Sequence, residues 1–181
     1  MSSRKQERLI LSERYRELAF EGTEVDRPAV LEDLRQALYA SKICAYAQGF
    51  NLLEEAGKVY GWDLQMGRIA KIWRSGCIIR ARFLDTVSEI FEKENGMTNL
   101  LASGYFSQVL YGARAGWGRI ISLAVERGAA IPALSSALAY FDSYRTARGS
   151  ANLLQAQRDC FGAHTYERID KEGAFHTDWM N

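Results

Sequence analysis

Cysteine is scarce in this chain, and the spacing of the few present excludes two common ways of stabilising a small domain. Cys44, Cys77 and Cys160 are odd in number and form neither a CxxC pair nor a Cys/His metal pattern. A disulfide framework and a zinc or other metal site are therefore not expected. A chain of this kind suits a reducing compartment, and we expect it in the cytoplasm.

Long apolar runs and blocks of like charge are also absent. No run of about 18 uncharged apolar residues occurs, so no membrane-spanning helix is expected. The first twenty residues are too charged for a signal peptide. The chain carries 23 Lys and Arg against 22 Asp and Glu, scattered along its length, for a net charge of +1. Because no basic surface is visible, we expect a soluble protein that binds neither nucleic acid nor a membrane.

Helical periodicity is what the sequence has in abundance. With 181 residues, 48% of them hydrophobic, and only 2 prolines, the chain can bury one substantial core. Asp26 and Pro28 form a helix start signal. Apolar residues then recur every three or four positions, at Val30, Leu31, Leu34, Leu38, Ile43, Tyr46, Phe50 and Leu53. This pattern predicts one long helix.

Three further segments show the same periodicity. Residues 60–91 contain Asp63 as a cap candidate and Gly76 as a break, which predicts two helices meeting at that glycine. Residues 98–128 and 133–147 predict two more. Strand-like alternation is absent throughout. We therefore predict an all-α fold.

The composition changes near Gly149. The final segment, residues 150–179, holds both histidines and shows no periodicity. We therefore predict a helical domain over residues 1–149 and an irregular tail over residues 150–181. The tail has too few regularly placed apolar groups for a core of its own, so its large aromatic side chains must dock on something. These side chains are Phe161, Tyr166, Phe175 and Trp179.

Four motifs resemble one known family. They are ALYASKICAYAQGF, IAKIWRSGCIIRARFL, YFDSYR and QAQRDCFGAHTYERIDKEGAFHTDW. Together they closely resemble the C-terminal helical domain of 6-phosphogluconate dehydrogenase, the NADP-dependent decarboxylating enzyme of the pentose phosphate pathway. The resemblance runs from SSRKQER to Trp179. It implies a helical domain that forms most of a homodimer, with a tail that reaches across and helps close the partner subunit's active site.

Arg158 and His164, in QAQRDCFGAH, are the candidate substrate-binding residues. They match the tail residues that, in the family, hold the phosphate of 6-phosphogluconate in the neighbouring subunit. An arginine offers a planar fork of donors for a phosphate, and an imidazole adds another donor. From the residues alone, such a pair is more often a surface cap or a structural group. His176 either lies near the coenzyme or belongs to the anchored tail end, and the role of Cys160, where the family usually has tyrosine, also stays open.

Two other motifs have structural explanations. In WRSGCIIR, residues 73–80, we expect the apolar side chains in the core, both arginines in ion pairs at a buried edge, and Cys77 as an inert buried thiol. Residues 142–145 in YFDSYR either face a cleft or form an internal network, and we leave them out of the site.

The reaction implied by the resemblance needs parts that this sequence lacks. In the family, 6-phosphogluconate is oxidised at C3 by NADP and then loses CO2 to give ribulose 5-phosphate, and the lysine base and glutamate acid belong to segments upstream of residue 1. The glycines of GARAGWG, Gly112 to Gly118, lie inside a helical pattern instead of a strand-to-helix turn. We therefore expect no N-terminal dinucleotide-binding domain, no bound NADP and no catalytic residue in this chain by itself.

Two functions remain open at this point. In the first, the chain is a fragment or split half that works with a separately supplied dinucleotide-binding domain. In the second, it is a non-catalytic module that dimerises alone or with a full-length relative and regulates it.

Overall fold

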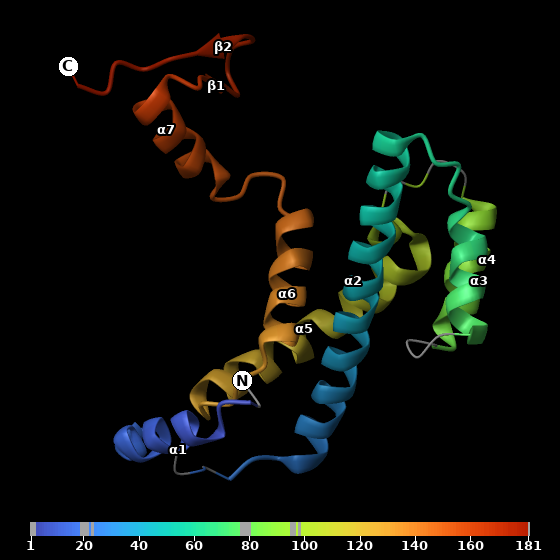
Figure 1. Ribbon diagram of the computed structural model, residues 1–181, viewed down its shortest axis with the longest axis vertical. Coiled ribbons are helices and arrows are strands. Elements are labelled where there is room, and N and C mark those ends of the chain that lie inside the picture. The colour runs from blue at the N-terminus through green and yellow to red at the C-terminus, as the bar shows by residue number, and fades with distance from the viewer. Residues whose placement is uncertain are drawn as a thin grey trace. The chain divides into compact units, whose positions relative to one another are not determined.

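The structure, a computed structural model, is built almost entirely of helices (Figure 1). It describes residues 3–18, 22, 24–76, 81–94, 97 and 99–180. The predicted all-α class is confirmed. The chain divides into two compact units, Met1–Leu138 and Ala139–Asn181. The boundary predicted at Gly149 concerns the functional tail and stays a prediction.

The first unit contains six of the described helices, the last of which extends into the second unit. They are α1 (Lys5–Arg14), α2 (Arg27–Tyr60), α3 (Met66–Gly76), α4 (Phe83–Lys93), α5 (Gly104–Glu126) and α6 (Pro132–Tyr144). Two short 3-10 turns, Arg16–Leu18 and Leu100–Ala102, lie between them. No helix in the described part of the chain is both long and apolar enough to cross a lipid bilayer.

The long predicted helix is confirmed as α2. At its start the Asp26 carboxylate accepts a hydrogen bond from the backbone N–H of Ala29 at 3.3 Å, and a proline lies in the first turn. At its end Gly61 has φ 68°, a left-handed conformation that favours a residue without Cβ. Two side chains of the periodic pattern, Leu31 and Leu38, are 64% and 52% exposed, so α2 presents apolar surface that this unit does not cover.

Helices α2 and α5 form the main core of the first unit. The buried face of α2 is lined by small residues, and α5 fills the space with large side chains such as Trp117 and Phe106, both fully buried. Arg119 binds Asp33 through two hydrogen bonds of 2.6 and 2.7 Å across the interface. A Cβ on Gly116 would lie 2.6 Å from Asp33 Oδ1. This glycine of GARAGWG therefore serves close helix packing.

Helices α3 and α4 form a second packed pair. Ser88 Oγ donates a hydrogen bond of 3.0 Å to the carbonyl of Gly67 between them. As predicted, α3 ends at Gly76. The ring of Trp73 packs on aromatic side chains of α2, and Arg74 forms an ion pair with an aspartate of α4 at 3.0 Å, at an exposed position. The remaining residues of WRSGCIIR, Cys77, Ile78, Ile79 and Arg80, lie outside the described residues.

The predicted tail, residues 150–181, lies within the second unit and is irregular apart from three short elements. It contains α7 (Ala151–Gly162) and a small antiparallel pair, β1 (Tyr166–Glu167) and β2 (Ala174–Phe175), coloured orange to red in Figure 1. Helix α7 does not bury an apolar face: Leu153, Leu154 and Phe161 are exposed, and its one buried residue is Asp159. The strands are two residues long, which is too short to show alternation. Both features explain why periodicity did not predict these elements.

Candidate functional site

The two predicted substrate-binding residues lie at the C-terminal end of α7. Arg158 is exposed one turn before the helix ends. In the described part of the chain, its guanidinium makes only a long hydrogen bond, from Nη1 to Gln155 Oε1 at 3.4 Å. His164 is also exposed and follows the helix end. Its ring lies against Gly162, where a Cβ would be 2.9 Å from His164 Nε2. Both side chains therefore have donors available to a ligand.

His164 sits in an unusual backbone turn. The residues on either side, Ala163 and Thr165, have φ values of 49° and 60°. Left-handed conformations cost about 1–3 kcal/mol each outside glycine, so the surroundings must hold them. The N–H of Ala163 donates to the backbone carbonyl of Asp159 at 2.8 Å, and the N–H of Thr165 donates to Asp159 Oδ1 at 2.9 Å. The side-chain amide of Gln155 donates to the carbonyl of Thr165. Both backbone polar groups of Thr165, its N–H and its carbonyl, are thus held by side chains of α7.

The Asp159 carboxylate is the centre of the second unit. It has no exposed surface, and it accepts four hydrogen bonds. Oδ1 binds the N–H of Thr165 and Nδ1 of His176, both at 2.9 Å. Oδ2 binds the N–H of Thr177 at 3.0 Å and Nε1 of Trp179 at 2.9 Å. One carboxylate therefore joins α7, the turn that carries His164 and the end of the tail.

The same contacts set the charge state of this carboxylate. Burial by itself raises the pKa of Asp159, but the four hydrogen bonds lower it more, and the pKa lies well below its usual range. The group is therefore ionised at neutral pH and can only accept hydrogen bonds. His176 Nδ1 must then be the donor. A neutral His176 consequently carries its hydrogen on Nδ1 and leaves Nε2 as an acceptor on a side chain that is 49% exposed.

The position of His176 bears on the question that the sequence left open. Its contact with Asp159, together with that of Trp179, anchors the tail end on α7. Phe175 packs on Tyr166 across the strand pair, with ring centroids 6.4 Å apart. These contacts lie within the tail itself, and Phe161 and Trp179 are 81% and 43% exposed. Docking of the aromatic side chains on another surface stays a prediction.

Sequence reasoning missed Asp159, although it lies next to Arg158. A buried carboxylate on a helix without an apolar stripe leaves no periodic signal. Its partners lie 6 to 20 positions away in segments without regular structure. No local pattern in the sequence indicated that these donors converge.

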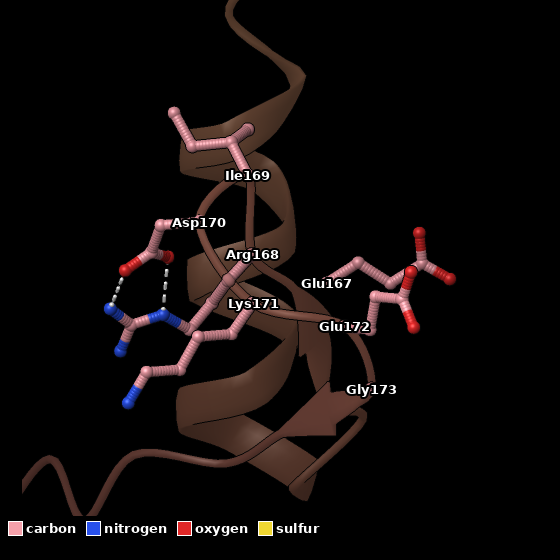
Figure 2. A pocket seen from close by; sticks show the side chains of 7 residues that line it. All are labelled: Glu167, Arg168, Ile169, Asp170, Lys171, Glu172 and Gly173. Atoms are coloured by element: carbon pink, nitrogen blue, oxygen red, sulfur yellow. Dashed lines mark hydrogen bonds and ion pairs between the residues drawn. The ribbon is translucent and has the colours of Figure 1, made fainter.

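The loop between β1 and β2 encloses a hollow of about 480 Å³ lined by residues 167–173. Figure 2 shows Arg168, Asp170 and Lys171 on one side of this loop and Glu167 and Glu172 on the other. Arg168 binds Asp170 through two hydrogen bonds of 2.6 and 2.8 Å. Because this carboxylate already occupies the guanidinium, and two further acidic side chains are close by, the hollow is a poor site for an anion.

In the described part of the chain, the cysteines and the other acidic residues form no metal-binding cluster, and the buried Cys44 is not a nucleophile. Burial raises the pKa of the Cys44 thiol to about 12, so it is not a nucleophile. Cys160 is exposed. Among the residues that the structure describes, no three His, Cys, Asp or Glu side chains are grouped to hold a metal ion.

Comparison with known proteins gives a consistent result. The family description "6-phosphogluconate dehydrogenase, C-terminal domain" matches residues 1–179. The enzyme named NADP(+)-dependent, decarboxylating 6-phosphogluconate dehydrogenase from Bacillus subtilis is 53% identical over 155 residues, which is 86% of this chain and 33% of that protein. Decarboxylating 6-phosphogluconate dehydrogenase 1 from Oryza sativa is 51% identical over 156 residues, 86% of this chain and 32% of that protein.

A solved structure agrees with these relatives. The 6-phosphogluconate dehydrogenase of Plasmodium falciparum, described in its apo form and in complex with NADP+ and with 6-phosphogluconate, matches with a TM-score of 0.89 and 36% identity. The match covers 97% of this chain and 38% of that one. The chain spans about a third of the length of the curated relatives it matches. It belongs to the 6-phosphogluconate dehydrogenase family and corresponds to the family's C-terminal domain.

Proposed function

We propose that this chain supplies the dimer-forming and substrate-closing part of a 6-phosphogluconate dehydrogenase. That enzyme converts 6-phosphogluconate to ribulose 5-phosphate with NADP. Family membership and the names of the relatives support this function. The observation that carries it is the presentation of Arg158 and His164 at the end of α7, from a turn that the buried Asp159 holds.

The chemistry of these two residues suits a phosphate monoester. The Arg158 fork can donate two parallel hydrogen bonds to two phosphate oxygens, and His164 can donate a third. Among the residues that the structure describes, no carboxylate pairs with either side chain, in contrast to Arg168 in the neighbouring loop. The role of the chain is thus to bind and orient the substrate, and the transfer of the hydride and the proton takes place on other groups.

The residues present do not fit NADP itself. Gly112, Gly116 and Gly118 lie within α5, and the described strands are two residues long, so the described residues form no strand-to-helix phosphate turn. We therefore derive no step of the reaction through NADP from this chain. The use of NADP is supported by the Bacillus relative, which is named as NADP-dependent, and by the Plasmodium enzyme, which is described in complex with NADP+.

We infer that the partner of the first unit is a second copy of this chain. Helices α1 and α2 expose several large apolar side chains, which a partner surface would cover. On α1 these are Leu9, Ile10 and Leu11, and on α2 they are Leu31, Leu38, Leu52, Val59 and Tyr60. In a homodimer, the tail would then contribute Arg158 and His164 to the partner subunit's substrate site. A location in the cytoplasm stays a prediction, because some relatives are named as chloroplastic.

A mixed-dimer experiment tests this proposal. A full-length relative, such as the Bacillus enzyme, has its own tail arginine and histidine replaced by alanine. It loses charge-assisted contacts worth about 1.5–3 kcal/mol each, so its kcat/KM falls by roughly one to two decades for each contact. Exchange with the present chain should restore activity, because Arg158 and His164 would complete one site of each mixed dimer.

The controls separate phosphate binding from simple stabilisation. The chain with Arg158→Ala and His164→Ala should form mixed dimers equally well, as native mass spectrometry would show, and should not restore activity. The Lys171→Ala chain, which loses an exposed cation of the same tail, should restore activity fully. Equal rescue by the wild-type and the doubly substituted chain would refute the assignment.

A further inference from the structure

We propose that Asp159 is the positioning residue of the phosphate contacts, and that its buried carboxylate sets the conformation in which Arg158 and His164 meet the substrate. The inference rests on the function proposed above. It follows from three observations in the second unit: the burial of Asp159, the backbone of the His164 turn, and the chemistry of the four donors.

Burial singles out Asp159 within its unit. Among the described residues from 139 to 180, it is the only one that is fully buried. Most folded segments are held by apolar side chains, but Leu153, Leu154 and Phe161 of α7 are exposed. The conformation of this segment therefore depends on hydrogen bonds to one charged group. Buried charges are tolerated only when such bonds satisfy them.

The His164 turn depends directly on this carboxylate. Ala163 and Thr165 are both left-handed, and non-glycine residues leave that conformation unless other contacts hold them. Asp159 Oδ1 holds the Thr165 N–H, and the Gln155 side chain holds the Thr165 carbonyl. Asp159 and Arg158 are also adjacent on α7, so the contact that fixes the turn lies one residue from the other phosphate ligand.

The isosteric substitution Asp159→Asn disrupts the four hydrogen bonds that the carboxylate accepts. In Asp159→Asn, an NH2 group replaces one carboxylate oxygen and meets two groups that were donors. If it replaces Oδ1, His176 can change tautomer and accept, but the Thr165 N–H loses its partner. If it replaces Oδ2, the Thr177 N–H and the Trp179 indole lose theirs. Either orientation releases part of the tail without changing the size of the side chain.

The mixed-dimer assay measures the consequence. With the Asp159→Asn chain, we expect the KM for 6-phosphogluconate to rise about tenfold or more, because Arg158 and His164 are present but displaced. The kcat should change by less than about threefold, and the KM for NADP should not change. A merely structural role would instead lower the amount of active dimer, which reduces the apparent kcat and leaves the KM for 6-phosphogluconate as it was.

Two further variants sharpen the test. Gln155→Ala removes the hydrogen bond to the Thr165 carbonyl and the long hydrogen bond from Arg158, without touching the buried charge, and it should raise the same KM by a smaller factor. Glu172→Gln removes one negative charge from the same tail and should behave as wild type. An unchanged KM in both Asp159→Asn and Gln155→Ala would overturn the inference while leaving the proposed function intact. Full rescue by the Arg158→Ala, His164→Ala chain would overturn the proposed function, and the inference with it.

An independent reading comes from the histidines of the 181-residue chain itself. Only two are present, His164 and His176, so histidine-selective nitrogen NMR gives two resolved systems. Wild-type His176 should show hydrogen on Nδ1, and Asp159→Asn should change that tautomer or release the ring. The His164 signals should shift in Asp159→Asn although the His164 ring makes no hydrogen bond to Asp159 in the structure. His164 signals that stay identical would contradict positioning by Asp159.

Discussion

Asp159 is a charged side chain without solvent contact in a unit whose other described residues are at least partly exposed. Four N–H donors replace the water that this carboxylate would otherwise bind. The resulting cluster stabilises the tail through directional hydrogen bonds. Apolar packing would instead stabilise it through the burial of surface area, which depends little on direction. Such a cluster specifies geometry well, because each donor must reach one of two oxygens. This property would suit a segment that places two phosphate-binding side chains, the role proposed for Arg158 and His164.

Acid should loosen this cluster. The folded-state pKa of Asp159 is depressed below its ordinary value of 3.8, so the ionised form stabilises the folded tail above about pH 4. That stabilisation is lost as the pH falls from about 4 toward the folded-state pKa. We expect the hydrogen-exchange protection of the Thr165 and Thr177 amides to fall, relative to the α5 amides, between pH 5 and pH 3.

Two substituted chains serve as controls for this acid effect. Asp159→Asn should lack the acid-dependent loss of protection, because it cannot titrate. Asp170→Asn should retain most of it, although hydrogen bonds from Arg168 also lower the pKa of Asp170. Constant relative protection of Thr165 and Thr177 in the wild-type chain from pH 5 to pH 3 would contradict the role given to Asp159.

At the scale of helices and strands, the ends of α2 illustrate which features a sequence reveals. Asp26 binds an N–H three residues ahead, and Gly61 closes the last turn. Both signals act within one helical turn, so they can be recognised without any tertiary contact. Helix α7 lacks equivalent signals, because no side-chain hydrogen bond caps its start at Ser150 and its left-handed C-cap is Ala163 instead of a glycine.

A matched pair of glycine substitutions, one at the end of α2 and one inside α5, tests the role of backbone conformation. Gly61 has φ 68°, and a Cβ there would meet nothing within 4 Å, so Gly61→Ala should lower the free energy of unfolding by about 1–2 kcal/mol through backbone conformation alone. Gly112 lies inside α5, also with open space at its Cβ, so Gly112→Ala should raise the free energy of unfolding by about 0.5–1 kcal/mol.

Urea denaturation followed by circular dichroism would measure both changes. The two substitutions add the same methyl group, so a shared effect of side-chain size would move both free energies in one direction. Opposite signs are the expected result, and equal signs would contradict the conformational explanation.

At the scale of the whole molecule, the exposed apolar side chains of α1 and α2 indicate assembly. We expect a stable homodimer whose interface buries more than about 2,000 Å², the size range of obligate interfaces. Analytical ultracentrifugation should show a dimer at micromolar concentration. A well-folded monomer at that concentration, with native circular dichroism, would contradict both the dimer and the placement of the tail in a partner subunit.

The sequence by itself determined helices α2 to α6, because their apolar periodicity and start signals act between residues a few positions apart. It did not indicate α1, which buries none of its residues. Its long motifs also determined the family and pointed to Arg158 and His164. Only the tertiary structure decided how these residues are held. The Thr165, His176 and Trp179 donors converge on Asp159 from up to 20 positions away. Arg119 binds Asp33, 86 positions earlier in the chain, and the Asp33 carboxylate lies so close to Gly116 that a Cβ would not fit there. Contacts between such distant residues follow from the path of the folded chain, and no local pattern of residue types encodes that path.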